Sequence, residues 1–440
     1  MEREISPPPT KRRRKPEEGR STSIGSQSEA TIQTGMRSIR IFSWNINGVQ
    51  SFLPSSTTPI TSFFKPVPKQ LKRAIDGSPS SHRNPETSKP PFAAPAASPL
   101  REFLARHEWP EVLFLQELKI NRQDQKTPAA LLSALNTPLG SNDSVTAASR
   151  YTLDTNLPRD KFNARGFGGK LYGVGTILRE DFASQHVATV RHAEWDLEGR
   201  VSIVELLQPS KAGLDWDTTC EHGRKRKASG SLAITNVYAV NGTSAPYRSS
   251  KNGQTVGTRH DHKINFHSKL RDECLQLEER GFDVVIAGDL NVARGRLDGH
   301  PNLRTWPKQH CINRADFNRK YFVEDDNHRA DAYVGQEDVD SGEARFQGID
   351  VFRAIRGQER KYTYHPRGEN EWGASCDRVD LIIASKALFE MGRLDDTDIL
   401  DSPQERGTSD HVPLWVKVKL NIGNRQNEAG GSARGPVNIV

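Results

Sequence analysis

Polar side chains capable of metal binding and proton transfer stand at the ends of short apolar runs. The run IFSW ends at Asn45 and Asn47, and the run LFLQ ends at Glu117. The same pattern places Asn241, Asp289, Asn291, Asp380, Asp410 and His411 beside later apolar runs. Carboxylate and amide oxygens suit a hard cation such as Mg²⁺, and a histidine beside a carboxylate suits proton transfer. The pattern therefore predicts a metal-assisted catalytic site.

A sheet is needed to bring these residues together, and the sequence predicts two. Short β-branched runs bounded by Gly, Asn or Asp predict strands over 38–44, 112–116, 172–178, 201–207, 232–240, 283–288, 379–384 and 412–418. Helices are predicted over 100–108, 128–135 and 262–280, the last with its inward face formed by Ile264, His267, Leu270, Cys274 and Leu277. Strands outnumber helices, which favours two packed sheets with outer helices over one doubly wound sheet. The strand ends would then hold the polar side chains at an open rim.

The composition indicates long unstructured segments around and inside this fold. The chain has 440 residues, a net charge of +7 and only 34% hydrophobic residues. We expect disordered tails over 1–36 and 421–440, and a folded domain over 37–420. Residues 50–99 contain ten prolines and nine serines, which predicts a disordered insertion inside that domain. Most of the excess positive charge lies in these segments, so total charge says little about the partners of the folded part.

Several classes of protein are disfavoured by the sequence. The four cysteines are too few and too scattered for a disulfide scaffold or a zinc site. His260, His262 and His267 also lack the spacing of a zinc-peptidase motif. No apolar run approaches the roughly 18 residues of a membrane span. The opening residues lack an apolar core, so we expect no secretory signal.

A basic run near the start of the chain predicts nuclear localisation. It consists of Lys11, Arg12, Arg13, Arg14 and Lys15. The alternative is an ordinary solvated charge cluster. Acidic residues in the same region disfavour a mitochondrial transit peptide.

A short apolar cluster inside the polar insertion has the spacing of a docking peptide. Ile60 stands three residues before the pair Phe63 and Phe64, so one helical turn places all three on one face. The segment 57–66 resembles the box that binds the sliding clamp PCNA, with Thr57 in place of the usual glutamine. The alternative is an apolar cluster that packs on the domain edge.

Six motifs, taken together and in order, carry a family resemblance. They are SWNINGV (43–49), LQELK (115–119), NVYAVN (236–241), GDLN (288–291), DRVDLIIAS (377–385) and SDHVPL (409–414). This set resembles the endonuclease/exonuclease/phosphatase superfamily, and within it the exonuclease III-like class II AP endonucleases. The resemblance covers about 38–420. It implies a DNase I-like, four-layered α/β sandwich of two packed mixed sheets flanked by helices, and a phosphodiesterase that uses Mg²⁺ or Mn²⁺.

The resemblance also implies a role for each matching residue. Glu117 would hold the metal, with support from Asn45, Asn47 and Asp410. Asp289 would orient or deprotonate the attacking water beside Asn291, and His411, oriented by Asp380, would face the scissile phosphate. Tyr238 would act at the phosphate, with Asn241 binding it.

The sequence departs from the family where an abasic sugar would bind. Val240 replaces the proline of the family's YxPN box, and Asp377 stands where a pocket tryptophan is common. We expect Tyr364 to form one wall of the pocket, and Trp372 either to replace the missing tryptophan or to pack locally. Arg378 is expected to contact a phosphate, the alternative being a structural ion pair.

The sequence thus predicts an enzyme that acts on DNA. The leading hypothesis is a nuclear AP endonuclease of base excision repair, with 3′–5′ exonuclease and 3′-phosphodiesterase activities as further expectations. One alternative is a related hydrolase of RNA, phosphoinositides or phospholipids. Another is a non-catalytic scaffold that docks on the clamp, which the full set of site residues argues against.

Overall fold

The computed structural model describes residues 35–53, 98–140, 143–164, 170–207, 217–219, 225–227, 231–322, 344–368 and 371–422. The predicted localisation signal at 11–15 and the clamp-like segment at 57–66 lie outside these residues. In the described parts of the chain, no helix has the length and apolar character needed to cross a membrane.

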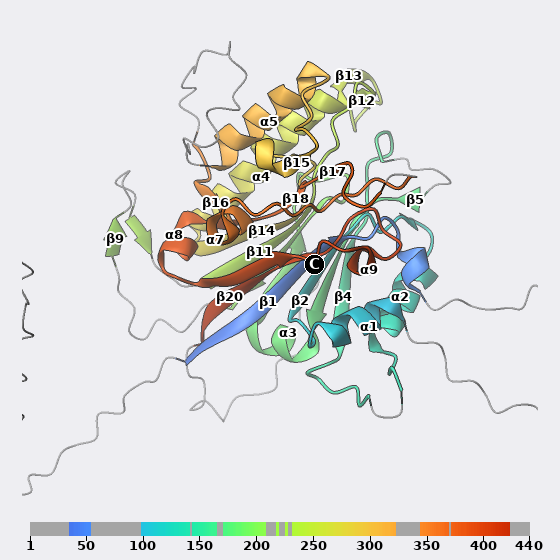
Figure 1. Ribbon diagram of the computed structural model, residues 1–440, viewed down its shortest axis with the longest axis vertical. Coiled ribbons are helices and arrows are strands. Elements are labelled where there is room, and N and C mark those ends of the chain that lie inside the picture. The colour runs from blue at the N-terminus through green and yellow to red at the C-terminus, as the bar shows by residue number, and fades with distance from the viewer. Residues whose placement is uncertain are drawn as a thin grey trace, which may run out of the picture.

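Two six-stranded mixed sheets form the centre of the fold (Figure 1). In order across the first sheet, the strands are β19 (Leu394–Ile399), β20 (Leu414–Ile422), β1 (Gly35–Asn45), β2 (Val112–Gln116), β6 (Val174–Arg179) and β4 (Tyr151–Asn156). The second sheet runs β16 (Gly348–Asp350), β18 (Asp380–Ser385), β14 (Phe282–Asp289), β11 (Ser231–Tyr238), β8 (Val201–Leu206) and β7 (Val187–His192). Each sheet has one central parallel pair, β1 with β2 and β11 with β14.

Alternation of side chains along the strands divides the core into layers. In β1, Ile39 and Ile41 point between the two sheets, whereas Phe42 and Trp44 point to the outer face. In β14, Val285 enters the central layer and its neighbours enter the outer one. The inner strands, such as β2, β11 and β14, are buried on both faces, which explains why they read as continuous apolar runs.

Helices cover the two outer faces (Figure 1). The first sheet is covered by α1 (Pro99–Arg106) and α2 (Lys126–Asn136), and the second by α4 (Arg259–Glu279) and α5 (Lys308–Tyr321). The shorter helices are α3 (Glu180–His186), α7 (Val351–Arg356), α8 (Lys386–Glu390), α9 (Pro403–Arg406), η1 (Val49–Phe52) and η4 (Arg296–Asp298). Two-stranded pairs join β3 (Ile120–Asn121) to β5 (Lys170–Leu171), β9 (Asp217–Thr219) to β10 (Lys225–Lys227), β12 (Pro246–Arg248) to β13 (Thr255–Thr258) and β15 (Gly299–His300) to β17 (Cys376–Asp377). The predicted four-layered sandwich is confirmed.

The structure corrects two details of the sequence prediction. Ile264 is only partly buried in α4, and Lys263 and Phe266 take the inward positions beside His267. The predicted insertion begins too early, because Val49–Phe52 forms a 3₁₀ turn. Ser98 caps α1, and its hydroxyl donates to the Phe52 carbonyl over 2.9 Å, so described residues from the two sides of 54–97 are in contact.

Candidate active site

The polar clusters meet because the strands that carry them end at the same rim. Asn45 is the last residue of β1 and lies opposite Gln116, the last residue of β2. Glu117 follows Gln116 in the chain. In the second sheet, Asp289 ends β14 and faces Tyr238 on one neighbour and Asp380 on the other. The carboxyl ends of parallel strands share one edge of a sheet. The structure therefore brings together the residues that the sequence predicted as catalytic and metal-binding.

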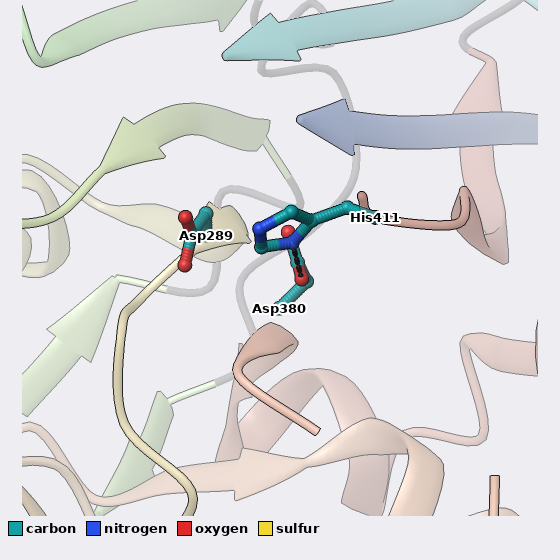
Figure 2. Close-up of side chains that lie close together, drawn as sticks. All are labelled: Asp289, Asp380 and His411. Carbon is teal, nitrogen blue, oxygen red and sulfur yellow. Dashed lines mark hydrogen bonds and ion pairs between the residues drawn. The ribbon is translucent and has the colours of Figure 1, made fainter. Parts of the chain in front are cut away.

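Asp289, Asp380 and His411 form the buried centre of this rim (Figure 2). The Nδ1 atom of His411 lies 2.7 Å from the Oδ2 atom of Asp380. The other ring nitrogen is turned toward Asp289, as Figure 2 shows. Asp380 thus orients the imidazole from behind and leaves its front to the pocket.

Burial and neighbouring charges make Asp289 and His411 complementary. Burial, with the Asp380 carboxylate, raises the pKa of Asp289 to about 7. Burial alone would lower the pKa of His411, but the charge and hydrogen bond of Asp380, together with the Asp289 and Asp410 carboxylates, outweigh it and raise that pKa to about 10. At neutral pH the rim holds a protonated imidazole beside a carboxylate that can accept a proton. Ligand atoms of the three residues lie within 4.8 Å of one another. His411 Nδ1 and Asp380 Oδ2 already pair with each other at 2.7 Å, which favours proton transfer over metal binding for these three residues.

Glu117 is the carboxylate best placed to hold a cation. The Tyr238 hydroxyl donates to its Oε1 atom over 2.8 Å, and the Lys119 ammonium lies 2.7 Å from its Oε2 atom. Burial raises the pKa of Glu117, but the Lys119 charge and the hydrogen bonds from Lys119, Tyr238 and Asn45 together lower it by more. The pKa therefore lies below its ordinary value. The ionised form is thereby favoured, as metal binding requires.

The donor set around Glu117 fits a metal ion. Lys119 also donates to Asn47 Oδ1, so oxygens of Glu117 and Asn47 already converge on one cation. Asp410 stands next to them and accepts a bond from Asn47 Nδ2 over 2.8 Å. Asn45 was predicted to support the metal. In the structure its Nδ2 atom donates to Glu117 and Asp289, and its Oδ1 atom accepts the Asn47 amide.

Three residues at the rim have positive φ angles, a backbone conformation that is rare for residues other than glycine and is often found in active sites. Asn47, Glu117 and Asn291 have φ angles of 52°, 55° and 53°, in the left-handed region that residues other than glycine seldom adopt. Gly288, directly before Asp289, has a φ of 153°, and a Cβ atom there would lie 1.9 Å from the Val237 carbonyl oxygen. These conformations turn the polar side chains sharply out of their strands.

A pocket of about 280 Å³ opens onto these residues and has a basic wall that the sequence analysis missed. The wall is formed by Lys263, Arg304, His310 and Arg314, which lie on α4, on α5 and in the segment before α5. Burial lowers the pKa of Lys263 to about 7, and its ammonium donates to the Asn291 carbonyl over 2.7 Å. The sequence signal that could have found this wall is Lys263, which stands four residues before His267 in the predicted helix 262–280. A hollow of about 670 Å³ beside Trp109 holds a single carboxylate, Asp143, already bound by Arg101.

The predicted substrate-binding residues have different outcomes. Tyr364 and Asn241 line the pocket, and the Tyr364 ring lies 5.1 Å from that of His411. Trp372 is not among the lining residues, since it stacks on His365 at 3.8 Å and packs against the core. Asp377 does line the pocket.

The prediction that Arg378 contacts a phosphate is wrong. Its guanidinium is 1% exposed and donates to Asp298 over 2.8 Å and to Asp350 over 2.7 Å. The partners use its donors and leave no path to the pocket. Arg378 instead fixes the backbone two residues before Asp380, where its own amide also donates to the Asp298 carbonyl over 2.8 Å. The three histidines with non-zinc spacing likewise have separate partners, Asn313, Glu198 and Asp316.

Comparisons with known proteins agree with this architecture. Residues 42–411 match the Endonuclease/Exonuclease/phosphatase family. A comparison with curated proteins gives no match. Among solved structures, the Leishmania major AP endonuclease LMAP is 17% identical with a TM-score of 0.50, over 87% of this chain and 88% of its own. The Xenopus laevis APE2 catalytic domain is 16% identical with a TM-score of 0.49, over 88% and 94%. The 3′ phosphatase NExo from Neisseria is 16% identical with a TM-score of 0.46, over 86% and 99%. At these identities the likeness establishes the fold alone.

Proposed function

The chain belongs to the Endonuclease/Exonuclease/phosphatase family, which makes it a metal-dependent phosphodiester hydrolase, and we propose that its substrate is DNA. More specifically, it would cleave on the 5′ side of abasic sites and remove nucleotides or blocking groups from 3′ ends. The observation that carries this proposal is one pocket in which Glu117, Asp289 and His411 face a basic wall.

Asp289 is suited to prepare the attacking water. Its Oδ1 atom accepts the Asn291 backbone amide over 2.9 Å, and its Oδ2 atom accepts Asn45 Nδ2 over 3.0 Å. These bonds fix the carboxylate plane. With its pKa raised to about 7 by burial and Asp380, the group can take a proton from water near neutral pH. The new bond joins the water oxygen to phosphorus, and the bond from phosphorus to the sugar oxygen breaks.

His411 is suited to stabilise the charge that builds on the phosphate. The imidazolium is fixed by Asp380 before the substrate arrives, so no reorganisation is needed during the reaction. Tyr238 keeps its proton, because burial and the Glu117 carboxylate raise its pKa well above the usual value. It therefore holds Glu117 in place as a hydrogen-bond donor.

The metal would be held by Glu117, with Asn47 and Asp410 beside it. When bound, Mg²⁺ or Mn²⁺ would supply Lewis-acid stabilisation of the phosphate and the leaving oxygen. Lys119 would give up its place between Glu117 and Asn47.

DNA is favoured over other phosphodiesters by three observations. Arg304, whose side chain is 60% exposed, and Arg314 place positive charge on the pocket wall, and attraction of this kind for phosphates is the main source of affinity for nucleic acid. The SWNINGV and LQELK motifs resemble the AP endonuclease branch, and LMAP, an AP endonuclease, shares the fold. Tyr364 and Val379 offer an aromatic and an aliphatic wall for an abasic sugar.

The test is cleavage of end-labelled duplex DNA that carries one abasic-site analogue, with Mg²⁺ and with EDTA. A duplex with an undamaged recessed 3′ end serves as the second substrate. Metal-dependent incision 5′ to the analogue would support the AP endonuclease proposal, and digestion from the 3′ end alone would make the enzyme an exonuclease. Failure on both substrates would contradict the proposal and direct the search to RNA and phospholipids.

Nuclear delivery by Lys11–Lys15 and clamp docking by Ile60, Phe63 and Phe64 are also proposed, on sequence grounds. Together they would place the enzyme at replicating DNA for base excision repair. Replacing the five basic residues by alanine should abolish nuclear accumulation of a fluorescent fusion. Capture by purified clamp should be lost in the Phe63→Ala/Phe64→Ala variant, and unchanged capture would contradict docking.

A further inference from the structure

Trp306 is exposed to an extent that is rare for tryptophan. It is 80% exposed, whereas the other exposed large hydrophobic side chains among the described residues reach at most 62%. Tryptophan has the largest apolar surface of any side chain and is usually well buried. No described residue stacks on its indole ring. Isolated exposed hydrophobic residues are common on protein surfaces. Two features distinguish Trp306, namely the contacts that hold its backbone and its place beside the pocket.

The backbone around Trp306 is held firmly by α5. Arg314 donates to the carbonyl of Arg304 over 2.7 Å, and Cys311 contacts the carbonyl of Thr305 over 3.3 Å. Pro307 is the N-cap of α5, and its carbonyl accepts the His310 amide over 2.9 Å. The turn that presents the indole is therefore ordered before any partner binds, which reduces the entropic cost of binding.

The position of Trp306 is at the edge of the catalytic pocket. Arg304, two residues before it, lines the pocket and lies 3.7 Å from Asp377, while its side chain is 60% exposed. His310 and Arg314, which follow Trp306 on α5, also line the pocket. An exposed aromatic ring beside exposed cations is the arrangement that binds unpaired nucleic acid, since bases stack on the ring and phosphates pair with the cations.

We propose that Trp306 is a stacking platform for an unstacked base in the substrate strand next to the cleaved phosphodiester. Arg304 would hold a neighbouring phosphate of that strand. The inference rests on the proposed action on DNA and adds a specificity determinant to it. Every base has a π face, so the platform would favour frayed, mismatched or lesion-flanking nucleotides irrespective of sequence.

The size of the effect follows from base–aromatic stacking. Loss of one such contact lowers affinity by roughly 5- to 100-fold. A phenylalanine in place of the indole keeps a flat aromatic face and should retain most of the affinity. Fully paired duplex offers no free base face, and its binding should change less than about twofold.

Binding is measured so that the result does not depend on turnover. The full chain carries Asp289→Asn to suppress cleavage, and Mg²⁺ is present. The probes are fluorescein-labelled duplexes with an abasic analogue, with one unpaired 3′ nucleotide, or fully paired. Fluorescence anisotropy gives the Kd of Trp306→Ala, Trp306→Phe and a control, Phe389→Ala, which removes a 40%-exposed ring on α8 away from the pocket. In a second readout, 2-aminopurine beside the analogue reports stacking by quenching.

The proposal expects a 5- to 100-fold higher Kd for Trp306→Ala on the two probes with unstacked bases. It also expects weaker 2-aminopurine quenching, near-normal binding by Trp306→Phe and no change for Phe389→Ala. A Kd within twofold of the parent for Trp306→Ala on both probes would overturn the stacking role. Equal losses on paired and unpaired probes would overturn it as well. Cleavage by the chain without these substitutions is tested separately. If the protein binds DNA through Trp306 but does not cleave it, the proposed function is refuted and the stacking role is not.

Discussion

Replacing Asp380 by asparagine removes one negative charge beside His411 and keeps a side chain of the same size. The two side chains are buried, with Nδ1 and Oδ2 2.7 Å apart. Taking the charge centres as roughly 4 Å apart and an effective dielectric constant of about 20, their attraction is about 4 kcal/mol. That energy corresponds to about 3 pKa units. The pKa of His411 should therefore fall from about 10 in the parent to roughly 7 in Asp380→Asn.

The assay is the pH dependence of kcat/KM on the abasic-site duplex. In the parent, activity should rise as Asp289 loses its proton near pH 7 and fall as His411 loses its proton near pH 10. In Asp380→Asn the alkaline limb should move down by about 3 units, because the imidazolium has lost its partner. The acid limb should also move down, since Asp380 is one cause of the raised pKa of Asp289. The maximum rate should drop about 10²–10⁴-fold.

A second aspartate–histidine pair provides the matched control. Asp401 lies 3.1 Å from the Nε2 atom of buried His365, and neither residue lines the pocket. Asp401→Asn should leave the positions of both limbs unchanged. If the alkaline limb of Asp380→Asn stays where it is in the parent, or if Asp401→Asn moves it equally, then His411 does not act as a cation maintained by Asp380.

Three further predictions address the metal, the buried ion pairs and the strand end. Glu117→Gln should raise the Mg²⁺ concentration for half-maximal activity and cut turnover about 10²–10⁴-fold; an unchanged Mg²⁺ titration would argue against this ligand. Arg378→Met should lower the free energy of unfolding in urea by about 3 kcal/mol, because it leaves the buried Asp298 and Asp350 with one arginine each, Arg353 and Arg294. Arg356→Met, at a half-exposed pair, should cost less than about 1 kcal/mol. Gly288→Ala should reduce cleavage and thermal stability, since its Cβ would collide with the Val237 carbonyl; a parent-like melting temperature would contradict this.

The elements that could be predicted are those buried on both sides. The eight predicted strands are all present, because short β-branched runs bounded by Gly, Asn or Asp are typical of inner strands. β19 (LDDTDI) was missed, since an edge strand carries charged side chains on its exposed face. α5 was missed because its inward face is largely polar and includes Asn313, Arg314 and Lys320. Periodicity in apolar residues does not reveal such a helix.

The sequence by itself determined which residue types stand at the strand ends. Asn45, Glu117, Asp289 and Asp380 follow or begin apolar runs, and the topology of packed sheets requires such ends to meet. The resemblance of the six motifs then supplied the reaction type. Nothing beyond local order along the chain was needed for this part.

Tertiary structure alone decided which charged side chains line the pocket and which are buried in ion pairs. Arg378 and its partner Asp298 are 80 residues apart in the chain, so their pairing could not be read from spacing. Lys263, Arg304 and Arg314 became a pocket wall only when α4 and α5 packed on the second sheet. The sequence shows the same arginine whether its charge is neutralised by a buried carboxylate or exposed to solvent. The difference lies in contacts between distant segments of the chain.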